Sequence, residues 1–185
     1  MRILLRVSAT AFVLLCSVSS AGALQQGLPP SWDGVWKGST TLTWASGKVE
    51  AADMELHVSP IPGGRAKVWK TVYAFSDRRE IREYEIRLLE EGGASRFVVD
   101  EKNGFLIDNY LADDTLYSQF TINGNLVTTR FALRGDTIEV ELTMFDVKNP
   151  RVTKLTGGSF EVASFSPKYV QRGILRRDRT GGNPK

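Results

Sequence analysis

The sequence has little of the residues on which thiol, redox and histidine chemistry depend. Cys16 is the only cysteine among 185 residues, and His57 is the only histidine. A mature chain that has lost Cys16 would form no disulfide and no thiolate metal site. One histidine supplies neither a histidine-based triad nor a multi-histidine metal centre. We therefore expect no metal, no cofactor and no catalytic residue of a familiar kind.

An excess of charge of one sign is also missing. The chain has 24 Lys and Arg against 21 Asp and Glu, and two of the basic residues, Arg2 and Arg6, precede the mature region. This balance argues against a nucleic-acid surface. Beyond the N-terminal run no stretch is long and apolar enough to span a bilayer. We expect neither nucleic-acid binding nor a membrane span in the mature protein.

The one long apolar run has the form of a secretory signal peptide. Arg2 and Arg6 precede the apolar stretch VSATAFVLLCSV, and Ala21-Gly22-Ala23 fits a small-x-small cleavage site. We predict a signal peptide over residues 1–23 and a secreted or periplasmic mature protein. The alternative is that the same segment is retained as an anchor.

Nearly all of the remaining chain has a β pattern. A lead-in segment (24–33) contains Trp32, which either plugs a barrel end or is exposed, and residues 178–185 form a polar, disordered tail. Between them, short alternating runs are separated by turn residues, and no segment keeps a helical period for three turns. We predict an all-β fold, a single antiparallel meander barrel of about ten strands over 34–177, because short loops make successive strands neighbours and so long a sheet closes on itself. The expected runs are 34–44, 49–58, 65–75, 80–89, 96–101, 105–111, 115–122, 126–134, 137–145, 158–165 and 168–177.

Hairpin loops test the register of this meander. A two-residue loop at Asn123-Gly124, the strongest turn signal, places Phe120 opposite Val127. In another hairpin, a four-residue loop places Lys70 opposite Glu85. Apolar residues face apolar residues and charges face opposite charges, as a correct register requires.

The same register places seven polar side chains among the apolar residues of the barrel interior. They form two groups, a row of Asn109, Ser118 and Thr129 and a cluster of Thr71, Tyr73, Arg82 and Tyr84. A buried polar group without a partner costs roughly 1–3 kcal/mol. We interpret the seven as ligand-binding residues of a largely apolar cavity, in which Arg82 and Tyr84 hold a carboxylate or similar head group. The alternative is that the row bonds itself and Arg82 lies in water at the rim of a filled barrel.

The two ends of the predicted barrel resemble a known family. Gly34-Val35-Trp36 in the first run and QRGILRR (171–177) in the last resemble the ends of lipocalin-like barrels of the calycin superfamily. In that superfamily the tryptophan of Gly-x-Trp closes the base of the barrel and an arginine of the last strand packs across it. The resemblance implies the first role for Trp36 and the second for Arg172 or Arg176. The chain departs from secreted lipocalins in having more strands and in lacking their disulfide and C-terminal helix.

These patterns predict an extracytoplasmic barrel that binds or carries a small apolar or amphipathic ligand without catalysis. One alternative is a metal-free cavity enzyme, an isomerase or cyclase, that polarises a carbonyl with Arg82, Tyr73 and Tyr84. Another is a structural or partner-binding envelope protein with a filled barrel, whose interface is made by the outward residues Val68, Val72, Tyr110 and Tyr117. A hollow interior distinguishes the first two from the third. Neither the ligand nor the oligomeric state follows from the sequence.

Overall fold

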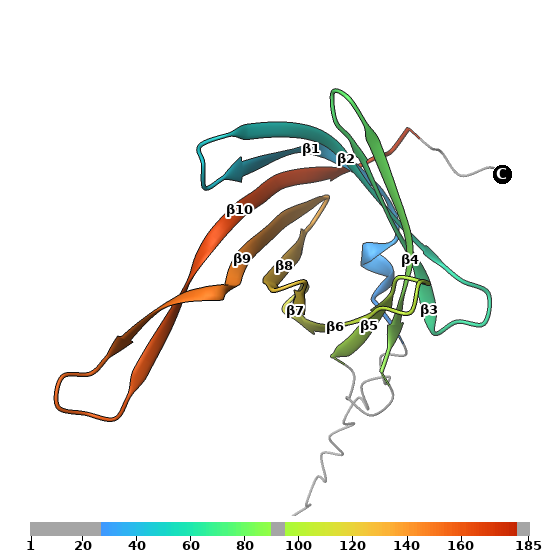
Figure 1. Cartoon of the computed structure of the whole chain (residues 1–185). Coiled ribbons are helices and arrows are strands. Elements are labelled where there is room, and N and C mark those ends of the chain that lie inside the picture. Colours follow the sequence, from blue (N-terminus) through green and yellow to red (C-terminus); the bar gives the residue numbers. More distant parts are fainter. Residues whose placement is uncertain (1–26, 90–94, 181–185) are drawn as a thin grey trace, which may run out of the picture.

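The segments in which apolar and polar residues alternate form ten β-strands in the computed structural model, which describes residues 27–89 and 95–180 (Figure 1). Each strand pairs antiparallel with its neighbours in the chain, and the first pairs with the last to close a barrel. The predicted all-β meander barrel is confirmed. The elements are η1 (Pro30–Trp32), β1 (Gly34–Trp44), β2 (Val49–Pro60), β3 (Ala66–Ala74), β4 (Arg79–Leu88), β5 (Arg96–Asp100), β6 (Leu106–Ala112), β7 (Thr115–Ile122), β8 (Asn125–Arg134), β9 (Thr137–Lys154) and β10 (Glu161–Arg177).

The predicted signal peptide (1–23) lies outside the described residues, as does most of the predicted tail (178–185). Within the described ranges, no helix has the length and hydropathy that crossing a bilayer requires.

The β7–β8 hairpin has the predicted register. Asn123 and Gly124 both have positive φ, 48° and 74°, as a type I′ turn requires. Phe120 lies opposite Val127, and Ser118 lies opposite Thr129.

The predicted register of the β3–β4 hairpin is wrong by two residues. Lys70 lies opposite Glu83 rather than Glu85, and the two side chains form an ion pair at 2.9 Å. The loop is shorter than predicted, because the Phe75 N–H donates to the Arg78 carbonyl at 2.8 Å and leaves only two residues between them. A shift of two keeps every side chain on its predicted face.

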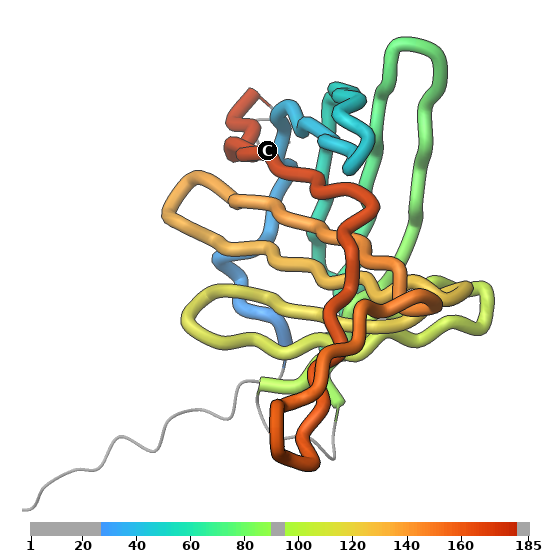
Figure 2. Tube along the Cα trace, turned by 60° about the vertical axis from the view of Figure 1, so that its left-hand side comes forward, coloured from blue at the N-terminus to red at the C-terminus, as the bar shows by residue number. Residues whose placement is uncertain are grey.

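β9 and β10 are longer than predicted and form an arm that projects from the barrel (Figures 1 and 2). Runs 158–165 and 168–177 were expected as separate strands, but residues 161–165 of the first and all of the second belong to β10, which has register irregularities at Ser164/Ser166 and Pro167/Tyr169. Past Asp146, β9 has no further partner on β8, and before Tyr169, β10 has none on β1. We call residues 147–168 the arm.

The core fills one end of the barrel, which we call the base. Trp32, in η1, is fully buried there and packs against Trp69, with ring centroids 6.1 Å apart. Trp32 is therefore a plug, and its carbonyl accepts a hydrogen bond from Trp36 Nε1 at 3.0 Å. The other fully buried large side chains are Trp36, Phe97, Met54, Leu56, Ile86, Leu116, Ile138 and Leu175.

Trp36 is fully buried at the base, and the arginine that lies across its ring is Arg177. Its guanidinium lies 4.0 Å from the Trp36 ring centroid and donates to the Ser31 carbonyl at 2.7 Å and to the Asp33 carbonyl. Gly34, at φ 133°, leaves room for it, since a Cβ there would lie 3.0 Å from the guanidinium.

The assignment of Arg172 or Arg176 to this role is wrong because of side-chain alternation. Arg177 lies directly opposite Trp36 on β1 and shares its inner face, whereas Arg176 lies opposite Lys37 on the outer face. Arg172 is also outside, where it donates to Glu141 at 2.9 Å.

Candidate functional site

The end opposite the base, which we call the mouth, contains an interior cavity with two lobes. The inner lobe has a volume of about 110 Å³, and the outer lobe has a volume of about 180 Å³. Tyr73, Arg82 and Leu142 line both lobes, so the two meet at these side chains. The barrel is thus packed at its base and hollow toward its mouth.

All seven polar residues selected from the sequence line the inner lobe. They are Thr71, Tyr73, Arg82, Tyr84, Asn109, Ser118 and Thr129. The rest of its wall is apolar apart from Glu101, and includes Trp69, Val99, Ile107, Phe120, Phe131 and Leu142. The two-residue shift in β3–β4 did not disturb this set, because it preserved which face each side chain occupies.

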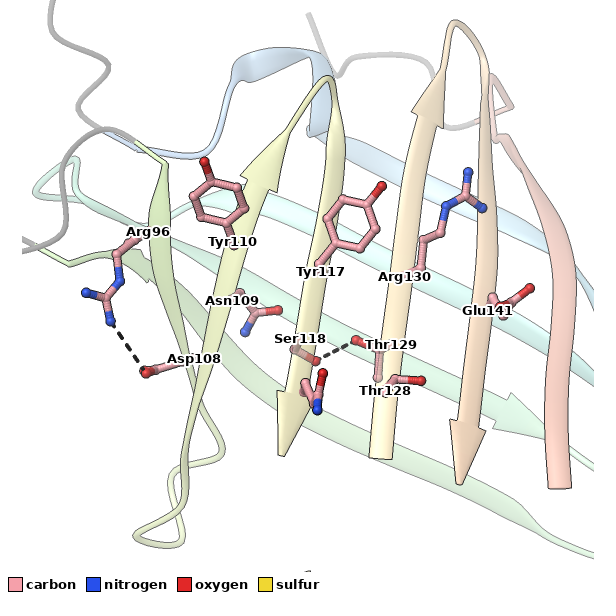
Figure 3. Close-up of a pocket in the computed structure, with 11 residues that line it drawn as sticks. Arg96, Asp108, Asn109, Tyr110, Tyr117, Ser118, Thr128, Thr129, Arg130 and Glu141 are labelled. Atoms are coloured by element: carbon pink, nitrogen blue, oxygen red, sulfur yellow. Dashed lines mark hydrogen bonds and ion pairs between the residues drawn. The ribbon is translucent and has the colours of Figure 1, made fainter. Parts of the chain in front are cut away.

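The polar row is partly satisfied by its own members (Figure 3). Ser118 Oγ and Thr129 Oγ1 form a hydrogen bond of 2.6 Å between β7 and β8. Asn109 does not join them, because its Nδ2 donates to the Ile107 carbonyl of its own strand at 2.8 Å. The row therefore keeps hydrogen-bonding capacity on the cavity wall, since a hydroxyl has two lone pairs and an amide has four sites.

Arg82 is placed where the lobes meet and is shared between a carboxylate and an aromatic ring. It donates to Glu80 at 2.9 Å, and its guanidinium lies 5.3 Å from the Tyr73 ring centroid. Its side chain is 46% exposed, so water reaches it from the mouth. Burial lowers the pKa of Arg82, but Tyr73 and Glu80 raise it by more, so the guanidinium stays charged.

Arg82 belongs to a charged cluster with Glu80 and Arg78, and the last two were not predicted from the sequence as residues of the site. Glu80 and Arg78 line the outer lobe, and Arg78 donates to Glu80 at 3.2 Å. Burial alone would raise the pKa of Glu80, but hydrogen bonds from Arg78 and Arg82 outweigh it and hold the pKa below 4.5. The predicted four-residue loop treated Arg78 as a turn residue and so hid this grouping.

The phenols of the cavity remain protonated at neutral pH. Burial raises the pKa of Tyr73 above 10.0, and the same cause raises the pKa of Tyr84 and Tyr169. Tyr73 and Tyr169 are therefore neutral hydrogen-bond donors in the cavity wall, whereas the Tyr84 phenol bonds the Glu101 side chain.

Trp44 and Tyr169 form the aromatic wall of the outer lobe. Their ring centroids lie 4.7 Å apart. The Trp44 Nε1 atom is buried and, among the described residues, has no hydrogen-bond partner. A buried N–H without a hydrogen-bond partner costs free energy, so an acceptor atom placed beside Trp44 Nε1 would be stabilised there.

A wider hollow of about 500 Å³ is lined mostly by outward residues of β5 to β9, and Asn109, Ser118 and Thr129 of the polar row line it as well (Figure 3). Tyr110 and Tyr117, from β6 and β7, are 53% and 44% exposed beside it. Its cations are already paired, Arg96 with Asp108 at 3.8 Å and Arg130 with Glu139 at 3.1 Å. The interior cavity is therefore the better candidate site.

The outward surface suggested for a partner interface is smaller than the sequence indicates. Tyr110 and Tyr117 are exposed and Val68 is half-buried, but Val72 is only 4% exposed and so is closed to a partner.

No family model matches the chain, and no curated protein matches it. Among solved structures it resembles the S-type phycobiliprotein lyase CPES from Guillardia theta, with a TM-score of 0.59 at 6% identity, over 81% of this chain and 90% of that one. A protein of unknown function from the DUF3598 family of Nostoc punctiforme gives 0.55 at 11% identity, over 80% of this chain and 48% of that one, about half its length. Rv2717c from M. tuberculosis gives 0.53 at 12% identity, over 81% and 94%. These likenesses show a shared fold, the lipocalin-like β-barrel, and nothing finer.

Proposed function

We propose that the protein binds a small amphipathic molecule with an acidic head group in the interior cavity. The observation that carries the proposal is that all seven inward polar residues line one lobe, which meets an outer lobe at Arg82. Ligand sites of this kind combine a largely apolar wall with a few convergent polar groups.

The division of the cavity supports an amphipathic ligand rather than a purely apolar one. Trp69 and Phe131, whose ring centroids are 5.3 Å apart, offer the inner lobe an aromatic wall for an apolar tail. Arg82 and the unpartnered Trp44 N–H lie toward the mouth and suit the oxygens of a carboxylate. Both lobes are smaller than the range of about 300–1,000 Å³ typical of drug-sized ligands, which favours a small molecule.

The comparison with the phycobiliprotein lyase supports a functional rather than a purely structural barrel only in general terms, because it shows that a barrel of this fold occurs in a protein named as a lyase. Our proposal for this chain is binding or carriage outside the cytoplasm. The extracytoplasmic part rests on the leader predicted over residues 1–23.

Titration with octanoate, and with uncharged 1-octanol as its match, tests the proposal. Trp44 and Trp69 line the two lobes, so a bound chain should change intrinsic tryptophan fluorescence in a saturable way. We expect Arg82→Ala to weaken octanoate binding by roughly ten- to a hundred-fold, the worth of a hydrogen bond to a charged group, and to leave octanol unaffected. Glu80→Gln should tighten octanoate binding, because it removes the carboxylate that competes for Arg82.

Arg96→Ala is the matched control, since Arg96 is an arginine of the outer face paired with Asp108. It should leave both ligands unchanged. Equal octanoate affinity in Arg82→Ala and the unaltered protein would remove Arg82 from the site, and no saturable change with either probe would contradict the proposed function itself.

A further inference from the structure

The arm is joined to the barrel at its root, where the Val147 N–H donates to the Gly124 carbonyl at 3.2 Å and the Lys168 carbonyl accepts from the Ala45 N–H. Beyond this root, among the described residues, its two strands pair only with each other, from Lys154 opposite Glu161 back toward Asp146, and the ribbon projects away from the other strands (Figure 1). A two-stranded ribbon alone is at best marginally stable in water. Such an element gains stability when another surface covers it.

Apolar side chains occupy both faces of the arm. Thr153 lies opposite Val162, and the Leu155 N–H donates to the Phe160 carbonyl at 3.0 Å, so Leu155, Phe160 and Val162 share one face. Their exposed fractions are 59%, 75% and 60%. Val152, on the opposite face, is 49% exposed. A flat protein surface would cover only one of these faces, whereas a bilayer interface surrounds a hairpin tip on both.

The arm is the basic part of the chain. Lys148, Arg151, Lys154 and Lys168 are its basic residues and Glu161 its only acidic one, which gives +3. Without Arg2 and Arg6 of the predicted leader, the rest of the chain has 18 basic and 20 acidic residues, which gives −2. Basic residues beside exposed apolar ones are the combination that binds anionic lipid surfaces.

From these observations we propose that the arm docks on an anionic lipid bilayer and inserts Leu155 and Phe160 into the boundary between head groups and acyl chains. The ribbon edges keep unpaired backbone groups, so insertion ends at this boundary and does not enter the hydrocarbon core. The flanking cations contact the lipid phosphates.

Docking brings the mouth of the barrel toward the membrane. The arm leaves the barrel where β10 reaches Tyr169, which stacks on Trp44 at the outer lobe, and the Lys168 carbonyl accepts from the Ala45 N–H at 2.9 Å.

Vesicle flotation tests the docking. The protein is mixed with phosphatidylcholine vesicles that either contain or lack phosphatidylglycerol, at low and at high salt. We expect binding to the anionic vesicles only, with a large loss at high salt because surface attraction is screened. The double variant L155S/F160S should lose at least about ten-fold in partitioning, since two exposed apolar side chains no longer insert. R151Q/K154Q should lose roughly five-fold for each charge removed.

The control is V49S/I174S, which replaces two apolar residues that are 62% and 55% exposed on the barrel strands β2 and β10. It should float like the unaltered protein. Thermal unfolding of the arm variants should be unchanged, because the arm makes no strand pairing with the barrel beyond its root.

Several results would overturn the proposal. One is the absence of flotation with anionic vesicles at low salt, and another is an equal loss in V49S/I174S. A third is a dimer, seen by sedimentation equilibrium, that L155S/F160S converts to monomer in a protein that binds no vesicles, since the arm would then join two copies of the chain. The octanoate titration is done without vesicles, so failure of the arm and failure of the cavity are separate outcomes.

Discussion

The same two strands, β1 and β10, build both ends of the barrel and do so differently. At the base Trp36 lies opposite Arg177, and at the mouth Trp44 lies opposite Tyr169. Trp36 is fully buried beneath the Arg177 guanidinium, whereas Trp44 is only partly buried and stacks on a phenol. Each pair joins neighbouring strands, yet only the pair at the base closes the interior.

The difference concerns where polar groups find their partners. At the base, Trp36 Nε1 and the Arg177 guanidinium donate to backbone carbonyls of the lead-in segment. At the mouth, Trp44 Nε1 has no partner among the described residues, and Arg82 shares itself between Glu80 and the Tyr73 ring. Trp32 Nε1, at the base, is also buried without a partner in the part of the chain that the structure describes, but Trp32 lines neither lobe of the cavity.

The base therefore serves stability, and the mouth keeps donors available for a ligand. Polar groups that are satisfied internally hold a fold in one arrangement, whereas unsatisfied ones at a cavity wall mark a place for binding. Three comparisons between pairs of substitutions test this contrast.

The largest difference is expected between the tryptophans of β1. Trp36→Ala removes a fully buried indole and should lower the free energy of unfolding by about 3–5 kcal/mol. Trp44→Ala removes a partly exposed one beside a cavity and should cost about 1–2 kcal/mol. Urea unfolding followed by circular dichroism measures both. Equal losses would mean that the mouth is packed as the base is.

A smaller difference is expected between two arginines of β10. Arg177→Ala loses the contact with Trp36 and the hydrogen bonds to the Ser31 and Asp33 carbonyls, and should destabilise the protein by about 2 kcal/mol. Arg172→Ala removes an exposed side chain paired with Glu141 and should stay within about 0.5 kcal/mol. If Arg172→Ala lowered the free energy of unfolding more than Arg177→Ala does, the contacts of Arg177 would not be what stabilises the base.

Most of the fold follows from side-chain alternation and turn chemistry in the sequence. Asn123-Gly124 fixed one hairpin because two residues at positive φ accept few other pairs. The alternation of side chains also predicted which residues line the cavity. The register error at the β3–β4 loop was two residues, and an even shift leaves every side chain on its predicted face. An odd error would have turned Thr71 and Tyr73 outward.

The rest depends on information that alternation does not contain. The arm has no buried face, so its residues show no regular apolar period, and Asn149-Pro150 reads as a loop although it lies within β9. The choice among Arg172, Arg176 and Arg177 required the register between the first and last strands, which no short loop sets. Because this register was unknown, the sequence also did not predict that Trp44 and Tyr169 lie opposite each other and stack.

The smallest effect is expected at Glu80, and it depends on pH. The folded pKa of Glu80 is below 4.5, because hydrogen bonds from Arg78 and Arg82 outweigh burial. The ionised group thus adds stability above pH 4.5 that is lost as pH falls through the lower folded value. Since the side chain is 35% exposed, the gain should be at most about 1 kcal/mol. Glu80→Gln should therefore lower the Tm slightly at pH 7, and the difference should vanish in acid.

Glu161→Gln on the arm is the control for this titration, because Glu161 and Lys154 form an ion pair with both side chains exposed. It should give the same Tm as the unaltered protein at both ends of the pH range. A Tm difference for Glu80→Gln that persists unchanged in acid would show that the charge of Glu80 does not hold Arg82. Arg82 would then have no competing carboxylate, and the contrast between mouth and base would rest on aromatic packing alone.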